Sequence, residues 1–418
     1  MVSKTKPQSE AMSLGYNPFL SEGSEKVPIF LSSTYKFKSA LAGEHAFALA
    51  YGLCEPEPGE CTDLIYMRIN HPNLQITEER LTRFEEGAED CAIFSSGMAA
   101  ITTVFSEFLK AGDMIICGGP LYGGTDHYLN KILPSLGVKV VFFDSSKTKE
   151  EIIDFVHATG ESKKLAMIYV ETPANPTNQL FDINELHDIA EYFSDSSKVY
   201  LAVDNTYMGP IFQSPLPLGA DLVLYSLTKY VGGHSDLVAG AVLGSKELIY
   251  RMKVRRTFIG NMSDPMTCWL LSRSIETLAL RMERESKSAE IVAQYLTKHS
   301  SVEKVYYIGN LTPEDGRQYR IKEKQCKSNG AMISFTVKGG KEIAYQLLDS
   351  LKLISLAVSL GGNESLAESP YFMTHADVDK KTKESLGISP GMIRLSIGIE
   401  DPEDLISDLE KAFGSIIY

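Results

Sequence analysis

The sequence predicts an α/β protein with a mainly parallel central sheet, helices on both faces of that sheet, and a smaller α+β domain after it. Three observations lead to this fold class. Short apolar runs alternate with amphipathic stretches between residues 74 and 244. The runs are continuously apolar, as in strands buried on both faces. The 418 residues are 44% hydrophobic with 32 Gly and 18 Pro, which excludes a disordered or collagenous chain.

The elements follow in three parts, which we expect to be an N-terminal arm (1–73), a cofactor-binding domain (74–280) and a C-terminal domain on the substrate side (281–418). The start of the arm is polar, and we expect the arm to lie on a neighbouring subunit; a partly disordered tail is the alternative. The expected strands of the second part are Ala92–Phe94, Met114–Cys117, Lys139–Phe143, Leu165–Val170, Val199–Val203, Asp221–Tyr225 and Leu237–Leu243. The helices expected between them are Met98–Leu109, Leu129–Leu136, Glu150–His157 and Ile183–Phe193.

After residue 246 the pattern becomes mostly helical as far as His299. Strands and helices then mix in the way expected of a small α+β domain. The expected elements are Val302–Tyr307, Ala331–Val337, a helix at Glu342–Leu351, Ser355–Ser359, Met392–Gly398 and a last helix from Pro402.

Charge and composition exclude several classes of protein. With 54 acidic and 41 basic residues the net charge is −13, which disfavours nucleic acid and anionic membranes as partners. No run approaches the ~18 apolar residues of a membrane span. The opening MVSKTKPQSE lacks the apolar core of a signal peptide, so we expect a cytoplasmic protein. The six cysteines form no CxxC pair, and we expect no metal site.

A lysine among hydroxyls is the most informative feature. Lys229 follows a buried strand and is flanked by Ser226 and Thr228. A solvated lysine at a strand end is the ordinary alternative. A desolvated lysine has a lowered pKa instead, and it can then attack a carbonyl or act as a base.

Two further stretches complete one chemical pattern. Ser96, Gly97 and Met98 stand where a strand ends and a helix begins, and the free N–H groups there suit a phosphate. Asp204 ends another apolar run, where a helix cap is the alternative reading. A Schiff-base lysine, a phosphate site and a carboxylate facing a ring nitrogen are what pyridoxal phosphate requires. A flat aromatic should cover the ring, and Tyr122 is suitably placed.

Ordered motifs extend this pattern from about Pro28 to the end of the chain. They are Tyr66–Arg68, Ser96–Met98, Leu121–Thr125, Glu171–Thr177, Val203–Tyr207, Ser226–Lys229, Gly233–Asp236 and Arg394–Gly398. With these motifs the sequence resembles the Cys/Met-metabolism family of pyridoxal-phosphate enzymes, which includes cystathionine γ-synthase, cystathionine lyases and methionine γ-lyase.

The resemblance implies roles for the matching positions. Lys229 would hold the cofactor covalently, Asp204 would pair with its ring nitrogen, and Asn175 would touch its ring hydroxyl. Tyr122 would stack on the ring and transfer protons to and from the amino group and the leaving thiol. The phosphate would be held by Gly97, Met98, Ser226 and Thr228.

Other matching positions imply a partner subunit and a substrate-binding loop. Tyr66 and Arg68 would reach the phosphate of a neighbouring subunit, so the resemblance implies active-site dimers that pair into tetramers. Arg394 would bind the α-carboxylate of a sulfur amino acid through its planar fork, with Ser359 in the matching loop.

The choice among family members depends on peripheral residues. Cystathionine-processing enzymes tend to have glutamate where this chain has Val358, and an apolar valine suits a thioether methyl better. Gly124 argues the other way, because methionine γ-lyases often have cysteine there. The sequence thus favours γ-elimination of L-methionine. The alternatives are cystathionine γ-lyase, and γ-replacement by a cystathionine γ-synthase or O-acylhomoserine sulfhydrylase.

Some positions depart from the family pattern. Met67 replaces serine or threonine, and His71 replaces asparagine. The acidic loop Cys54–Asp63 is longer than usual, and it either lines a neighbour's site or is a surface insertion. Ser369–Phe372 replaces the usual His-Pro-Ala-Ser. We expect two histidines that could suggest a metal or acid–base role, His234 and His375, to be structural.

Overall fold

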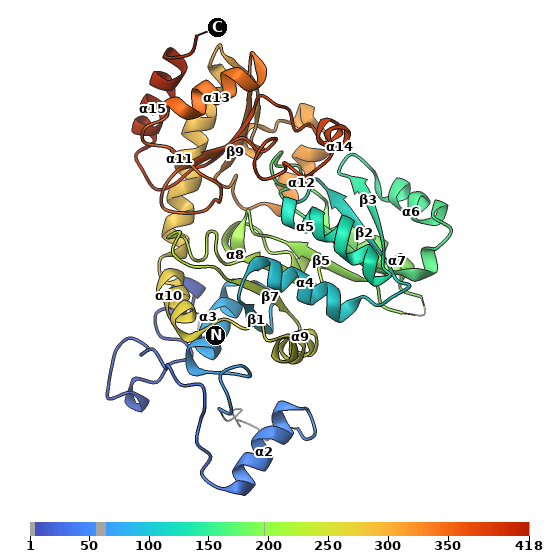
Figure 1. Cartoon of the computed structure of the whole chain (residues 1–418), viewed down its shortest axis with the longest axis vertical. Helices are drawn as coiled ribbons and strands as arrows, with labels where there is room; N and C mark the ends of the chain where they lie inside the picture. Colours follow the sequence, from blue (N-terminus) through green and yellow to red (C-terminus); the bar gives the residue numbers. More distant parts are fainter. Residues whose placement is uncertain (1–4, 56–63, 196, 418) are drawn as a thin grey trace.

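The computed structural model describes residues 5–55, 64–195 and 197–417. Three parts follow one another along the long axis of the molecule (Figure 1). The segment with helix α2 (Ala40–Ala50) lies at one end, a large sheet with its helices occupies the middle, and a second sheet with the C-terminal helices forms the other end. Most of the predicted long loop, residues 56–63, lies outside the described residues.

The central sheet has the strand order β1-β7-β6-β5-β4-β2-β3. Neighbours from β3 to β6 are parallel, whereas β7 runs antiparallel to both β6 and β1. The expected mainly parallel sheet is confirmed, and one reversed strand makes it mixed. The strands are β1 (Asp90–Phe94), β2 (Met114–Gly119), β3 (Lys139–Asp144), β4 (Leu165–Glu171), β5 (Tyr200–Asp204), β6 (Leu222–Ser226) and β7 (Gly240–Gly244).

Side chains of these strands alternate between two apolar cores, one on each face of the sheet. In β2, Ile116 belongs to the larger core and Cys117 to the smaller one. The smaller core packs beneath α4 (Gly97–Phe108) and α9 (Lys246–Ile259). The larger core packs against α3 (Pro72–Phe84), α6 (Lys149–Ala158) and α7 (Ile183–Phe193). Burial on both faces explains why the runs are continuously apolar.

Two expected elements differ in the structure. The helix expected at Leu129–Leu136 is present but is not a regular α-helix, because Tyr128–Ile132 is π-helical and Leu133–Leu136 is 3₁₀-helical. Pro134 lacks an N–H and disrupts regular α-helical bonding there. The strand predicted from Leu237 begins only at Gly240. Ala239 instead binds the Thr228 hydroxyl, donating to it at 3.1 Å and accepting from it at 3.2 Å.

The C-terminal part is built on a five-stranded sheet of order β10-β11-β12-β9-β8. Only β10 and β11 are parallel in it. Its strands are β8 (Val302–Tyr306), β9 (Met332–Val337), β10 (Ser355–Leu356), β11 (Leu366–Glu368) and β12 (Met392–Ser396). The helices around it are α11 (Leu278–Lys298), α12 (Arg317–Gln325), α13 (Gly340–Ser350), α14 (Lys380–Ser385) and α15 (Pro402–Gly414). The smaller α+β domain is thereby confirmed.

Helices α3 and α11 connect the three parts. Both predicted domain boundaries, 73/74 and 280/281, fall in the first turn of these helices, and the division stays a prediction. His71 is the N-cap of α3, since its Nδ1 accepts from Leu74 N at 3.2 Å. This departure from the family pattern therefore has a structural use. The remaining helices are α1 (Pro7–Glu10), α5 (Gly123–His127), α8 (Gly209–Phe212) and α10 (Pro265–Ile275).

Candidate active site

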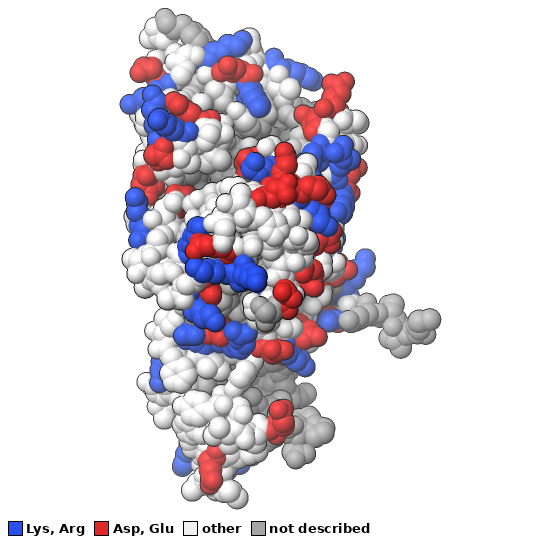
Figure 2. Space-filling view, turned by 90° about the vertical axis from the view of Figure 1, so that its right-hand side faces the viewer, with Lys and Arg blue, Asp and Glu red and all other residues white. Residues whose placement is uncertain are grey.

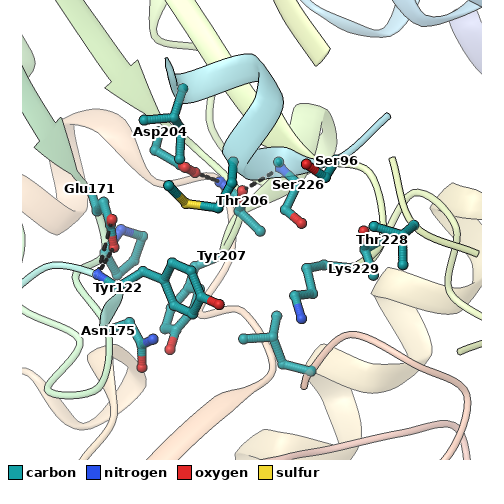
Figure 3. A pocket seen from close by; sticks show the side chains of 16 residues that line it. Ser96, Tyr122, Glu171, Asn175, Asp204, Thr206, Tyr207, Ser226, Thr228 and Lys229 are labelled. Carbon is teal, nitrogen blue, oxygen red and sulfur yellow. Dashed lines mark hydrogen bonds between the residues drawn. The ribbon is translucent and has the colours of Figure 1, made fainter. Parts of the chain in front are cut away.

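A cavity of about 230 Å³ lies where β4, β5 and β6 end and α4 begins. This is the edge at which ligands bind in open α/β sheets. In Figure 3, Lys229 reaches the cavity from one side and Tyr122 with Asn175 from another, while Ser96, Thr206 and Ser226 gather together. The lining residues are Ser96, Gly97, Met98, Ile101, Tyr122, Glu171, Pro173, Asn175, Asp204, Thr206, Tyr207, Ser226, Thr228, Lys229, Val238 and Leu360.

The amine of Lys229 has the properties of a nucleophile. It lies mostly buried just after β6 and donates to Ser359 Oγ at 2.8 Å. Burial is the main cause that lowers its pKa to about 8, and the nearby Arg394 cation acts in the same direction. Glu368 opposes this effect. A substantial fraction of this amine is therefore neutral near physiological pH.

The start of α4 and the end of β6 form a site with the shape and donors for a phosphate. Ser96 caps the helix, because its Oγ accepts from Ala99 N at 2.9 Å. A Cβ on Gly97 would lie 2.9 Å from Ser226 Cβ, so only glycine allows the start of α4 to lie this close to the end of β6. Free N–H groups and the helix dipole favour an anion at this position.

Two carboxylates stand side by side on neighbouring strands. Glu171 ends β4 and Asp204 ends β5, and the two residues are paired in the parallel register. Burial raises the pKa of both side chains, and the neighbouring Asp204 charge raises the pKa of Glu171 further. A cationic ring nitrogen next to Asp204 would offset this cost. Glu171 also accepts from the backbone N of Tyr122, at 3.0 and 2.9 Å to its two oxygens.

A buried ion pair lies at the back of the site. Arg394 and Glu368 are cross-strand partners in β12 and β11, and Arg394 Nη2 lies 2.8 Å from Glu368 Oε1. Arg394 also donates to Asn175 Oδ1 and to the Ser359 carbonyl, both at 3.0 Å. Ser359 has a φ of 99°, a left-handed conformation that is costly for a serine. The bond to the Ser359 carbonyl joins Arg394, the residue expected to bind the substrate carboxylate, to the loop that also contacts Lys229.

The structure brings most of the predicted site residues together around one cavity. Ser359 and Arg394 join it through hydrogen bonds to lining residues. Tyr66 and Arg68 do not line the cavity of their own chain, and Arg68 Nη1 donates to the Thr257 carbonyl at 2.7 Å. Val358 is 55% exposed and lies next to Ser359 without lining the cavity. The roles of these residues stay predictions.

Sequence reasoning assigned no role to several residues that form the site. They are Glu171, Thr206, Tyr207, Leu360 and Glu368. Glu171 had a readable signal, because it ends an apolar run on the strand next to the one ending in Asp204. Glu368 had none, since its pairing with Arg394 depends on the antiparallel register of two distant strands.

Both histidines singled out in the sequence make contacts with the backbone. His234 Nδ1 lies 2.7 Å from the Gly232 carbonyl, and His375 Nε2 lies 3.2 Å from the Leu121 carbonyl. Burial lowers the pKa of His375 to about 4. Within the described part of the chain no group of three or more His, Cys, Asp or Glu side chains could hold a metal ion.

These residues fit pyridoxal phosphate. A nucleophilic lysine, an open helix N-terminus for the phosphate and a buried carboxylate for the ring nitrogen surround one cavity. Glycine at residue 97 supports this fit, because without a Cβ the N-terminus of α4 can approach Ser226 at the end of β6 closely. Fold and site together thus define a pyridoxal-phosphate-dependent enzyme.

Comparison with known proteins gives the family. Residues 9–414 match the family described as "Cys/Met metabolism PLP-dependent enzyme", and the chain belongs to this family. An L-methionine γ-lyase of Fusobacterium nucleatum subsp. nucleatum is 39% identical over 396 residues, 94% of each chain. Human cystathionine γ-lyase is 39% identical over 388 residues, 92% of this chain and 87% of the human one.

Solved structures agree with this assignment. Cystathionine γ-synthase of Xanthomonas oryzae pv. oryzae, in complex with cystathionine, superposes with a TM-score of 0.86 at 31% identity, and it covers 99% of this chain and 98% of its own. The predicted cofactor and enzyme class are thereby confirmed. No helix among the residues described here is long and apolar enough to cross a membrane.

Proposed function

We propose that this enzyme cleaves L-methionine by γ-elimination, with water, to 2-oxobutanoate, ammonia and methanethiol. The observation that carries the choice of substrate is Val358, an apolar residue beside Ser359 at the position where cystathionine-processing enzymes tend to have glutamate. A valine there offers nothing to the distal ammonium group of cystathionine, whereas an apolar side chain at this position suits a thioether methyl better.

The chain's own residues divide the work as follows. Bound pyridoxal phosphate supplies an electron-accepting ring that stabilises negative charge on the substrate carbons. With a pKa of about 8, Lys229 can accept the Cα proton near neutral pH and deliver it to a neighbouring carbon. Ser359 Oγ, 2.8 Å from the amine, holds the lysine in position. Asp204 provides the negative charge that the ring nitrogen needs.

Arg394 and Tyr122 act on the two ends of the substrate. The guanidinium of Arg394 is fixed by Glu368 and Asn175, so it can bind the α-carboxylate with little loss of side-chain entropy. The phenol of Tyr122 is 44% exposed and lines the cavity. It can donate a proton to the departing thiolate.

We also infer that the enzyme is a dimer in which each active site contains residues of both chains. Tyr66 and Arg68 lie outside the cavity of their own chain, as expected of residues that serve a neighbour. The end of the molecule that bears the arm shows few charged side chains in Figure 2. It carries exposed apolar residues that a partner could cover, namely Phe19, Leu20, Leu31, Leu41 and Leu53.

Subunit complementation tests this inference. Arg68→Ala and Lys229→Ala chains are each expected to be nearly inactive alone. Refolded together, they should recover activity, because a mixed dimer contains one site with both wild-type residues. No recovery in mixtures that do form dimers would contradict the shared site. The pairing of dimers into tetramers is measured separately by analytical ultracentrifugation. A cytoplasmic location stays a prediction from the sequence.

Cystathionine γ-lyase is the second candidate. Its human form is as similar to this chain as the methionine γ-lyase of Fusobacterium nucleatum, at 39% identity for both. Gly124 favours it on the sequence pattern. A Cβ on Gly124 would lie 2.7 Å from Tyr122 Cε1 and 3.2 Å from Met98 Sδ, so a larger residue there would have to displace these two side chains.

The deciding experiment offers the substrates separately. L-Methionine, L-cystathionine, and O-acyl-homoserine with cysteine are incubated with the enzyme, and 2-oxobutanoate, released thiol and cystathionine are measured. We expect the highest kcat/KM with L-methionine. Formation of cystathionine from the homoserine ester, without methanethiol from methionine, would replace the proposal with γ-replacement.

A matched pair of variants tests the role of Val358. Val358→Glu introduces a charge that can attract the distal ammonium of cystathionine, and Val358→Gln has nearly the same shape without the charge. The side chain is half-exposed, so the attraction should reach only about 1 kcal/mol. The Glu variant should therefore favour cystathionine over methionine by about fivefold more than the Gln variant. Equal ratios in both variants would refute the discriminating role of this position.

A further inference from the structure

A single peptide group, between Leu121 and Tyr122, is held at both ends. Its carbonyl oxygen lies 3.2 Å from His375 Nε2. Its N–H donates to both oxygens of Glu171, at 3.0 and 2.9 Å. Because the carbonyl and the N–H belong to one planar unit, the two contacts together fix the plane of that unit.

The ring of His375 is suited to this contact. A carbonyl can only accept, so Nε2 must carry the hydrogen. His375 is buried, and its lowered pKa of about 4 keeps the ring neutral over the physiological range. The ring also contacts the Thr374 hydroxyl, 3.1 Å from Nδ1, and the backbone of Asn175. These contacts hold the orientation of the ring.

Segment 369–378, which carries His375, is tied to the substrate side of the site. Thr374 Oγ1 donates to Glu368 Oε1 at 2.8 Å, and Glu368 forms the buried pair with Arg394. The segment also touches the backbone next to Tyr122, since a Cβ on Gly123 would lie 2.1 Å from the Thr374 carbonyl.

A buried lysine fixes the same segment from the other side. Lys383, on α14, is 5% exposed, and its Nζ donates to three backbone carbonyls at 3.2, 3.1 and 3.3 Å. The carbonyls belong to Tyr371, His375 and Ala376. The segment is therefore held by bonds at several points along its length.

The Tyr122 side chain needs such support. With 44% of its surface exposed, it lacks the surrounding packing that would fix its ring. The fixed peptide group described above holds the backbone from which this side chain extends, and it thereby limits the positions that the hydroxyl can reach in its χ1 and χ2 rotamers.

We propose that His375 and Glu171 are positioning residues for Tyr122, and that segment 369–378 sets the distance from the Tyr122 hydroxyl to the carboxylate-binding Arg394. The inference rests on the proton-transfer role proposed for Tyr122. It predicts that loss of the His375 contact slows proton transfer without weakening the phosphate site, which lies on other elements.

Two variants of His375 separate the contact from the bulk of the ring. In His375→Gln the amide nitrogen can reach the place of Nε2 and still donate to the Leu121 carbonyl. In His375→Asn the amide nitrogen reaches only the place of Nδ1. We measure kcat and KM with the sulfur amino acid that the unsubstituted enzyme cleaves fastest. His375→Asn should lose about 10- to 100-fold in kcat, with His375→Gln restoring most of it. A Gln variant as slow as the Asn variant would overturn the proposal.

The decisive control crosses His375→Asn with Tyr122→Phe. If His375 acts through the phenol, the Asn substitution should cost less than about twofold in the Phe background, because coupled residues are not additive. A purely structural role would give the full loss in both backgrounds, and this result would refute the inference. If His375→Asn does not fold, the same test is made at the N–H end of the peptide group. Glu171→Gln keeps an oxygen that can accept from Tyr122 N, whereas Glu171→Leu does not.

Two readouts do not depend on turnover. The dissociation constant of pyridoxal phosphate, from quenching of protein fluorescence, should change by less than about threefold in His375→Asn. The induced circular dichroism of the bound cofactor should weaken in His375→Asn and recover in His375→Gln, because it reports the fixed surroundings of the ring. A large loss of cofactor affinity, or an unchanged dichroism band in both variants, would contradict positioning. A different preferred substrate would overturn the proposed function alone.

Discussion

The lowered pKa of Lys229 gives a sharp prediction for attachment of the cofactor to cofactor-free protein. Only the neutral amine can attack the aldehyde. With a pKa of about 8, roughly one amine in ten is neutral at pH 7. A lysine at its ordinary pKa of ~10.4 would have roughly one in 2,500. The attachment rate should therefore rise about tenfold from pH 7, pass its midpoint near pH 8 and reach a plateau by about pH 9.5.

Stopped-flow absorbance at fixed pyridoxal phosphate follows this attachment. The control is the reaction of pyridoxal phosphate with Nα-acetyl-lysine in the same buffers. The cofactor titrates in the same way in both reactions, but the control amine has an ordinary pKa. Lys229→Met provides the background without covalent attachment. A rate that still climbs tenfold per pH unit above pH 9, parallel to the control, would refute the desolvated amine.

The lowered pKa of Lys229 also predicts how the stability of the cofactor-free protein changes with pH. A lysine pKa lowered by folding means that the unfolded chain binds more protons between pH 8 and ~10.4, so stability should rise with pH across that window. Below pH 8 the buried amine of Lys229 is mostly charged, and the full cost of burying that charge lowers the stability of the folded protein. Lys229→Met should then raise the free energy of unfolding of the cofactor-free protein at pH 7 by up to about 3 kcal/mol. Urea denaturation checks this value, and a destabilised Met variant would contradict it.

Two other predictions concern single contacts of the site. Gly97→Ala should weaken pyridoxal phosphate binding by at least about tenfold, because its Cβ would lie 2.9 Å from Ser226 Cβ, while Gly414→Ala, with nothing within 4 Å, serves as control in the same fluorescence titration. Glu368→Ala should destabilise the protein by roughly 3–5 kcal/mol in urea denaturation, since it leaves Arg394 buried and unpaired. Equal cofactor affinity in the two glycine variants would contradict the first prediction. A Glu368→Ala protein as stable as the unsubstituted protein would contradict the second.

The sequence was sufficient for the architecture because the strands of the central sheet are buried on both faces and their apolar runs are unbroken. It also pointed to Lys229, Asp204 and Gly97 as candidates, because each ends or follows a strand or opens a helix, and the three residues line one cavity. The antiparallel direction of β7 could not be read, since an apolar run looks the same in either direction. The late start of β7 depends on a side-chain bond from Thr228 to Ala239.

The parts of the site that were missed depend on tertiary register. Glu368 meets Arg394 only because β11 and β12 pair antiparallel in one register. His375 reaches the Leu121 carbonyl across 254 positions of the chain. The left-handed backbone of Ser359 could not be expected from a residue type that rarely adopts it. Local patterns predict strands, caps and strand ends, but contacts of this kind appear only when the chain is folded.

One competition assay tests the central claim most directly. Equal concentrations of L-methionine and L-cystathionine are offered together to the enzyme with bound pyridoxal phosphate, and initial rates of methanethiol and cysteine release are compared. The ratio of these rates equals the ratio of the two kcat/KM values and is unaffected by enzyme concentration. We predict that methanethiol is released faster than cysteine. Faster release of cysteine would contradict the assignment of L-methionine as the preferred substrate.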